Sequence, residues 1–201
     1  MMLKQFYHPR LIEAGCDEAG RGCLAGPVFA AAVILPKDYV NNDLNDSKKL
    51  TARQRNRLHV EITHNAIAWN IASCSNNEID VMNILRASVT AMHRAVDGLP
   101  AKPQLLLIDG NRFYAYGKIP HVTVIRGDAT YLSIAAASVL AKTARDQFME
   151  ELDAEYPMYG WSHNKGYPTP GHRKAIMEYG ITQWHRLTFN LRELQRELRF
   201  L

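Results

Sequence analysis

Four acidic residues in this sequence follow short apolar runs. Asp17 and Glu18 close the run that begins at Leu11, Asp109 closes QLLLI, and Asp128 follows VTVIRG. Because ligands of sheet proteins gather beyond strand ends, these carboxylates meet at one point if their strands are neighbours. Each acid alone is better explained as a turn or helix-cap residue. Their joint pattern indicates a site.

The chemistry of such a site follows from its donors. Clustered carboxylates repel one another, so the pKa of at least one member rises unless a cation is bound. Oxygen donors without accompanying His or Cys favour Mg²⁺ or Mn²⁺. Three or four acids predict two divalent ions, which together activate a water and stabilise the leaving oxygen of a phosphodiester. The acids therefore predict a nuclease.

Asp17 and Glu18 are adjacent, and adjacent strand residues point to opposite faces of a sheet. For both to reach one metal site, we expect a bend or bulge at this position. Gly15 and Gly20 flank the pair and would permit it.

The glycine-rich segment after the first acids is suited to a nucleic-acid strand. Gly20 and Gly22 leave backbone amides accessible on either side of the Arg21 guanidinium. The alternative is a hairpin link with one solvated arginine, which three residues alone do not exclude.

Two further segments carry candidate contacts with substrate. Lys48 lies in a polar Ser-Lys-Lys stretch suited to phosphate, although lysine pairs are more often solvated surface. Lys165 and Tyr167 share a Gly/Pro-containing loop, where an exposed aromatic ring can stack on a sugar or base beside a cation. Alternatively, Tyr167 packs beneath the loop.

The elements that position these residues follow from the apolar pattern. Thr51 and Gln54 stand at capping-box spacing before a helix. Apolar residues recur every three or four positions from Ile79 to Val96, which predicts one amphipathic helix ending before Gly98. The predicted strands cover residues 11–16, 27–35, 66–74, 104–108 and 122–125, and the predicted helices cover 52–65, 79–96, 133–155, 170–179 and 191–200.

The composition is that of a globular protein with one main core. Of 201 residues, 47% are hydrophobic and 22% charged, which excludes disordered, collagen-like and coiled-coil chains. This length supports a single domain. The net charge of +4 favours polyanionic partners modestly.

Cysteine usage and hydropathy bear on the compartment. The three cysteines lack CxxC spacing, which argues against a disulfide framework or structural zinc and favours a reducing compartment. The first ten residues lack the apolar core of a signal peptide, and no apolar run is long enough to span a membrane. We expect a cytoplasmic protein without a membrane partner.

A series of short motifs runs in order along nearly the whole chain. Together they resemble the type 2 ribonucleases H, in particular bacterial ribonuclease HII. Each motif alone is weakly specific, but this many in one order is highly specific. The motifs are Asp17-Glu-Ala-Gly-Arg-Gly22, Leu24-Ala-Gly-Pro-Val28, Asp46-Ser-Lys-Lys-Leu50, Ile108-Asp-Gly110, Gly127-Asp128, Ile134-Ala-Ala-Ala-Ser138, Ala141-Lys142, Arg145-Asp146, Lys165-Gly-Tyr-Pro-Thr169 and His185-Arg186.

The resemblance implies an α/β protein with a ribonuclease H-like fold, in which helices flank a five-stranded mixed sheet. A catalytic domain would cover residues 1–160. Residues 161–201 would form a small helical C-terminal segment that contacts substrate and packs as part of the same unit.

The resemblance also implies an endoribonuclease that hydrolyses the RNA strand of RNA–DNA hybrids. It would also cut 5′ of single ribonucleotides embedded in duplex DNA, leaving 3′-hydroxyl and 5′-phosphate ends. It implies a monomer that serves ribonucleotide excision repair and DNA replication, with two Mg²⁺ or Mn²⁺ ions as cofactors.

Residue roles carried over from the family motifs complete these expectations. The four acids would bind the metals and catalyse, with Asp17 bridging both ions and Asp128 on the second ion. The remaining roles concern substrate: Gly20, Arg21 and Gly22 would read the 2′-hydroxyl, Tyr167 would stack on the following deoxyribose, and Lys48 and Lys165 would contact the backbone.

Alternative functions remain open on the sequence alone. One is a ribonuclease H-like DNA endonuclease, against which the Gly-Arg-Gly and Lys-Gly-Tyr segments argue. Another is a catalytically silent nucleic-acid-binding module, against which the presence of all four acids argues. A nucleotide-cofactor enzyme is disfavoured because neither GxGxxG nor GxxxxGK[ST] occurs.

Overall fold

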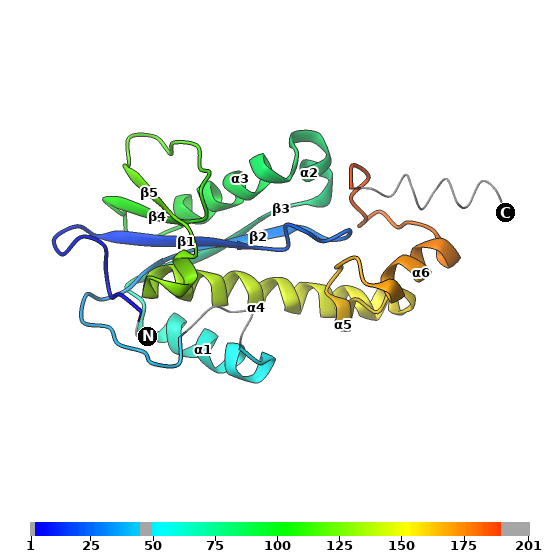
Figure 1. Ribbon diagram of the computed structural model, residues 1–201, viewed down its shortest axis with the longest axis horizontal. Helices are drawn as coiled ribbons and strands as arrows, with labels where there is room; N and C mark the ends of the chain where they lie inside the picture. The colour runs from blue at the N-terminus through cyan, green and yellow to red at the C-terminus, as the bar shows by residue number, and fades with distance from the viewer. Residues whose placement is uncertain (1–2, 45–49, 190–201) are drawn as a thin grey trace.

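A five-stranded sheet with helices on both faces forms the body of the molecule (Figure 1). The computed structural model describes residues 3–44 and 50–189. The strands are β1 (Glu13–Ala19), β2 (Val28–Ile34), β3 (Ala68–Cys74), β4 (Leu105–Asp109) and β5 (His121–Val124). The helices are α1 (Ala52–Asn65), α2 (Asn76–Met82), α3 (Ile84–Asp97), α4 (Leu132–Glu155), α5 (Trp161–Asn164) and α6 (Pro170–Tyr179), with 3₁₀ turns η2 (Gly127–Ala129) and η3 (Pro157–Tyr159).

The strand order is β3-β2-β1-β4-β5. β1, β2 and β3 pair antiparallel, whereas β4 and β5 run parallel to β1, so the expected mixed sheet is confirmed. The parallel pairing of β1 with β4 ends at Cys16 opposite Ile108, while the antiparallel pairing of β1 with β2 continues to Ala19. The last residues of β1 therefore extend beyond the end of β4.

The strand residues alternate between two apolar layers. Ala30 and Ala32 of β2 belong to the core beneath α3, and Ala31 and Val33 belong to the core beneath α1 and α4. Burial on both faces explains why PVFAAAVIL reads as a continuous apolar run rather than an alternating one. Figure 1 shows α3 and α4 on opposite sides of the sheet.

Helix α4 lies unusually close to β1. A Cβ atom at Gly15 would stand 2.2 Å from the carbonyl carbon of Ser133, so only glycine fits between strand and helix. This close approach holds the face of α4 against the strand that carries the first two acids.

Most predicted helix boundaries are confirmed, but one helix is divided. Thr51 forms the predicted capping box with Gln54. The predicted helix 79–96 is wrong as a single element, because Asn83 takes φ 70° between α2 and α3. The Asn83 side chain then accepts hydrogen bonds from the first amides of α3, so the break also caps the new helix. The predicted helix 191–200 lies outside the described residues.

Residues 161–189 pack against the link between β1 and β2 and the end of α4. Trp161 and Ile176 share an apolar cluster with Leu24, Ala25 and Met149. The division at residue 160 stays a prediction. Among residues 3–44 and 50–189, no helix has the length and apolar character needed to cross a membrane.

Candidate active site

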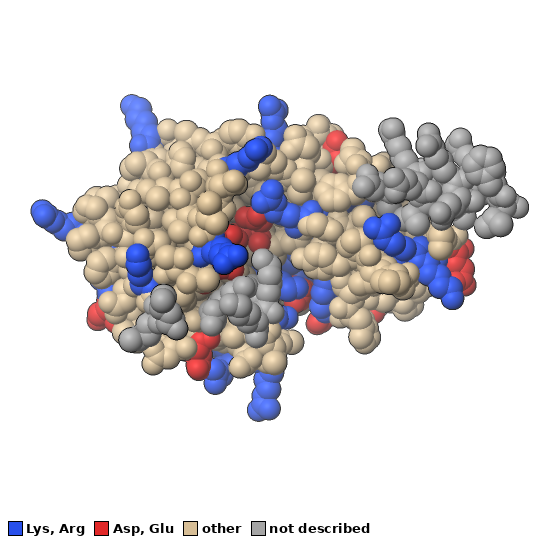
Figure 2. Space-filling view, viewed as in Figure 1, with Lys and Arg blue, Asp and Glu red and all other residues tan. Residues whose placement is uncertain are grey.

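Three of the four predicted acids border one pocket. Asp17, Glu18 and Asp109 line a cavity of about 290 Å³ at the end of β4. Figure 2 shows a hollow near the centre of the visible face, with acidic atoms in its floor and Lys and Arg side chains around its rim. The pocket lies where β1 extends beyond the end of β4, its parallel neighbour. This is the strand-end position that the sequence predicts.

Asp17 and Glu18 reach this pocket from opposite faces of β1. Asp17 is hydrogen-bonded to Ser138 of α4, whereas Glu18 also borders a small cavity lined by Ser88 of α3. The expected bulge is not present, because the pairing with β2 runs without an extra residue from Gly15 to Ala19. Both side chains reach the pocket because β4 stops and leaves this edge of β1 open.

The Asp17 carboxyl is poorly placed for a lone negative charge. It is 5% exposed, and its pKa is raised well above the ordinary value by burial, then by the charges of Glu18 and Asp109. Hydrogen bonds from Ser138 and from the backbone amide of Glu18, at 2.7 Å, oppose this shift. The repulsion expected of a metal-free acidic cluster is thus present here.

Asp128 lies beside Asp109 but does not line the same pocket. The amide of Gly127 donates to Asp109 Oδ1 at 2.7 Å, which fixes η2 against the end of β4. Asp128 follows directly and is 8% exposed. The hydrogen bond from Gly127 to Asp109 therefore holds the turn that carries Asp128 near the end of β4.

The donor chemistry fits a hard divalent cation. Every candidate ligand is a carboxylate, and the buried Ser88 hydroxyl next to Glu18 and Asp109 has no hydrogen-bond partner in the described part of the chain. The described residues hold no group of three or more His, Cys, Asp or Glu side chains already arranged around a metal position. Coordination would therefore require these carboxylates to turn from their present hydrogen bonds.

The predicted substrate-reading residues line the same pocket. Gly20, Arg21 and Gly22 form one wall, and Tyr167 lies against them, its Cε1 3.8 Å from where a Cβ of Gly22 would be. Arg21 pairs with Glu18 at 3.0 Å, although its side chain is 52% exposed. A ligand that displaced Arg21 from Glu18 would lie close to both the guanidinium and the acidic side chains of the pocket.

Two buried arginines hold this wall in place. Arg186 donates to the carbonyls of Gly20, Arg21 and Gly26 at 2.8, 3.0 and 2.9 Å. Arg145 occupies the space that a Cβ at Gly20 would need, where φ is +98°. Burial lowers the pKa of Arg186 to about 10, which leaves it charged at neutral pH.

Arg145 extends the same scaffold to the Tyr167 loop. It donates to the carbonyls of Ala25, Pro27 and Lys165. Arg145 and Arg186 lie within the sequence motifs, which predict no role for either residue. A charged residue inside the Ala-rich helix 133–155 was the available signal for the first of them.

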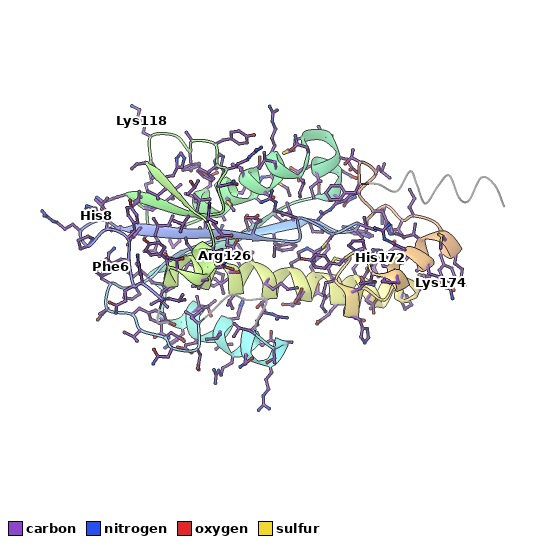
Figure 3. The ribbon with its side chains drawn as sticks, in the orientation of Figure 1. Phe6, His8, Lys118, Arg126, His172 and Lys174 are labelled. Atoms are coloured by element: carbon purple, nitrogen blue, oxygen red, sulfur yellow. The ribbon has the colours of Figure 1, made fainter. Side chains whose placement is uncertain are left out.

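A histidine pair fixes the backbone at Tyr167. Trp161 Nε1 can only donate, so His172 Nε2 accepts it at 3.0 Å and the Nδ1 proton is donated to the Tyr167 carbonyl. His185 Nδ1 accepts from the amide of Thr182, which directs its Nε2 proton toward His172 Nε2. His172, labelled in Figure 3, thus connects α6 to the pocket wall.

The two predicted lysine contacts differ in outcome. Lys165 points into a neighbouring groove between α1 and α4, where its ammonium binds Glu150 at 2.5 Å, and only its backbone serves the pocket wall. Lys48 lies outside the described residues. The structure instead places Lys142, to which the sequence analysis assigned no role, in the pocket with the acids.

Solved structures with a similar fold define the class of protein. The chain matches the ribonuclease H2 of Pyrococcus horikoshii with a TM-score of 0.78 and 25% identity, covering 93% of this chain and 98% of that one. It matches a structure described as the PCNA:RNase HII complex from Archaeoglobus fulgidus with a TM-score of 0.75 and 25% identity, covering 90% and 96%. The ribonuclease H-like fold expected from the sequence is confirmed.

Sequence comparison identifies the family. Residues 14–192 match the family model for ribonuclease HII. A ribonuclease HII of Bacteroides thetaiotaomicron is 63% identical over 190 residues, which cover 94% of this chain and 95% of the relative. The chain belongs to the ribonuclease HII family and is an endoribonuclease of the ribonuclease H class.

Proposed function

We propose that this enzyme hydrolyses the RNA strand of RNA–DNA hybrids and cuts on the 5′ side of single ribonucleotides embedded in duplex DNA. The products carry 3′-hydroxyl and 5′-phosphate ends. One observation carries the proposal: the acids Asp17, Glu18 and Asp109 share a pocket with the Gly20–Gly22 wall and Tyr167. The pocket is thus lined both by acids that could bind metal ions and by groups that could contact the sugar of a bound nucleotide.

The acids are the proposed metal ligands. Asp17, Glu18, Asp109 and Asp128 would hold two Mg²⁺ or Mn²⁺ ions, which supply an activated water and stabilise the leaving oxygen. The residues themselves are held from several sides: Asp17 by Ser138, and Asp109 by the amide of Gly127. These contacts hold the acids at the pocket, and the carboxylates would turn from them to coordinate an ion.

Recognition of the ribonucleotide is assigned to the wall and the stacking ring. The backbone of Gly20 and Gly22 approaches the sugar closely, and the Arg21 guanidinium donates toward the 2′-hydroxyl, the group that distinguishes RNA from DNA. The half-exposed ring of Tyr167 stacks on the deoxyribose that follows. Because Arg145 and Arg186 hold the wall rigidly, its donors need little reorganisation when substrate binds.

Lys48 and Lys165 complete the proposed backbone contacts, although the Lys165 ammonium must first leave Glu150. A cytoplasmic monomer acting in ribonucleotide excision repair and DNA replication is the setting that we propose for this activity. The basic net charge of +4 is consistent with a polyanionic substrate.

The test compares a duplex DNA carrying one ribonucleotide with its all-DNA twin. Each is incubated with Mg²⁺, with Mn²⁺ and with chelator, and the cut position is read on a sequencing gel. We expect metal-dependent cleavage of the ribonucleotide strand alone, on its 5′ side.

Cleavage of both duplexes would replace the proposal with a DNA endonuclease. Binding without cleavage of either would leave a nucleic-acid-binding module. A long RNA–DNA hybrid in the same assay tests the second half of the substrate range.

A further inference from the structure

One lysine lies in the acidic pocket without pairing with an acid of that pocket. Lys142 lines it together with Asp17, Glu18 and Asp109, yet within the described residues its ammonium donates to Asp146 Oδ1, at 2.5 Å. A lysine that served only to neutralise the three acids would be drawn onto one of them, because opposite charges attract strongly in a partly buried site. Asp146 instead keeps the Lys142 ammonium away from the three acids.

The spacing on α4 sets the place of this ammonium. Ser138, Lys142 and Asp146 are four residues apart, so they share one face of the helix. Ser138 is bonded to Asp17, and Lys142 begins four residues, about 6 Å, farther along the helix axis. The ammonium therefore stands beside the acidic cluster rather than within it.

Asp146 is shared between two cations. Its Oδ2 accepts from Arg55 of α1 at 3.0 Å while its Oδ1 accepts from Lys142, and the residue is 7% exposed. Two cations on one carboxylate leave a net positive charge of one, and the Lys142 end of this group faces the pocket. An ammonium has three donors, so the bond to Asp146 leaves two for a ligand.

We propose that Lys142 binds a phosphate oxygen of the cleaved strand next to the scissile phosphate, and that Asp146 and Arg55 position its ammonium for this contact. The inference rests on the proposed function and extends it to a residue without an assigned role. Phosphates are the anionic groups of the substrate strand, and a strand entering a pocket lined by three carboxylates needs cations beside them. A lysine supplies such a charge as a compact donor.

The direct test removes the positive charge from the protein and the negative charge from the substrate in turn. Duplexes with one ribonucleotide carry a neutral methylphosphonate in place of one phosphate at a time on either side of the scissile position. We expect one position to lower the wild-type cleavage rate about 10- to 100-fold. Lys142→Met should lose a similar factor on the unmodified duplex and lose no more than about twofold further at that position.

Binding supplies a readout that does not depend on turnover. In chelator, the slope of log Kd against log salt should become shallower by about 0.9 for Lys142→Met, the change expected for one lost phosphate contact. Lys118→Met is the matched control, because Lys118 is exposed and lies at a remote corner of the molecule (Figure 3). The control should leave rate, position dependence and slope unchanged.

Two further variants separate contact from positioning. Lys142→Arg keeps the charge and should keep the salt slope while recovering only part of the rate, because its planar group does not reproduce the ammonium geometry. Asp146→Asn should also keep the slope and lower the rate, since the ammonium is retained but released. These variants carry the test if thermal unfolding shows that Lys142→Met does not fold.

A methylphosphonate penalty that persists in full in Lys142→Met, with an unchanged salt slope, would overturn the inference even if the rate fell. An unaltered rate in Lys142→Met would overturn it as well. Failure of the wild-type protein to cut the unmodified duplex is a different result, because it contradicts the proposed nuclease function itself.

Discussion

The ionised Asp17 carboxylate lowers the stability of the fold. It is buried, and neighbouring negative charges raise its pKa, so its ionised form is disfavoured in the fold. A group with a raised pKa stabilises the fold at low pH and loses that contribution as pH rises above its unfolded value. At neutral pH the acidic cluster is therefore destabilising, and a bound cation would relieve the repulsion.

We expect Asp17→Asn to lower cleavage by at least about 100-fold, because it removes a metal-binding charge. The variant should unfold at the same temperature as wild type or higher in chelator, since the repulsion is gone and the amide oxygen still accepts from Glu18. Cleavage assays and thermal unfolding check the two halves. A near-wild-type rate would remove Asp17 from the proposed site.

The proposed role of Arg21 is substrate selection, and its ion pair with Glu18 is exposed to solvent on the arginine side. We expect Arg21→Ala to lower cleavage at a single embedded ribonucleotide about 10- to 100-fold, the scale of a lost charge-assisted hydrogen bond, with metal affinity little changed. Rates on the ribonucleotide duplex and metal titrations measure both quantities. Arg10→Ala removes another exposed positive charge, before the start of β1, and serves as the control. Unchanged selectivity in Arg21→Ala would refute direct reading of the sugar.

At the scale of elements, the contact between β1 and α4 positions both Asp17 and Ser138. We expect Gly15→Ala to destabilise the protein by about 3 kcal/mol or more, because its methyl group would overlap the backbone of Ser133. Gly171→Ala is the matched control: nothing lies within 4 Å of its added Cβ, and it sits in α6. That change should be neutral or stabilising by up to about 1 kcal/mol.

Urea unfolding of the two variants decides this prediction. Equal stability of Gly15→Ala and wild type would mean that α4 can move away from the strand, and the close approach would then not determine the geometry of the acids.

The strands and most helices could be predicted because their signals are local. Apolar runs, the Thr51 capping box and the Pro170 helix start each act within a few residues. The break at Asn83 was missed because the apolar spacing continues across it, while the left-handed backbone depends on one side chain bonding to the next helix. Periodicity alone does not detect such a cap.

The site was predictable to the extent that it follows strand ends. Three acids meet where β4 stops, as their positions after apolar runs indicated. The expected bulge was wrong because the sequence does not show where the pairing of β1 with β4 ends. The structural role of Arg145 and Arg186 could not be predicted because their partners are backbone carbonyls, which every residue carries.

At the scale of the whole molecule, the buried histidines tie the C-terminal segment to the pocket. Burial lowers the pKa of His172 from its ordinary value, and it lowers that of His185 to about 4. A histidine kept neutral in the fold binds a proton more readily when unfolded, so its stabilising contribution is lost as pH falls from about 6.5 toward 4.

We expect His185 to account for up to about 3 kcal/mol of the stability lost between pH 6.5 and 4. His185→Asn keeps an oxygen that can accept from Thr182 but does not titrate, so it should be less stable at pH 7 and less sensitive to acid. Urea unfolding at several pH values measures how steeply the free energy of unfolding changes with pH in each protein. Parallel slopes for the variant and wild type would contradict the prediction.

The contacts of Arg145 and Arg186 with the Gly20–Gly22 wall also affect the order in which the parts of the site form during synthesis. The guanidinium that holds the Gly20 carbonyl belongs to Arg186, 166 residues later in the chain. A ribosome must therefore release the chain as far as Arg186 before the Gly20–Gly22 wall can be fixed. The acids at the ends of β1 and β4 emerge much earlier, so a growing chain would hold its proposed metal ligands before the proposed substrate-reading wall is in place.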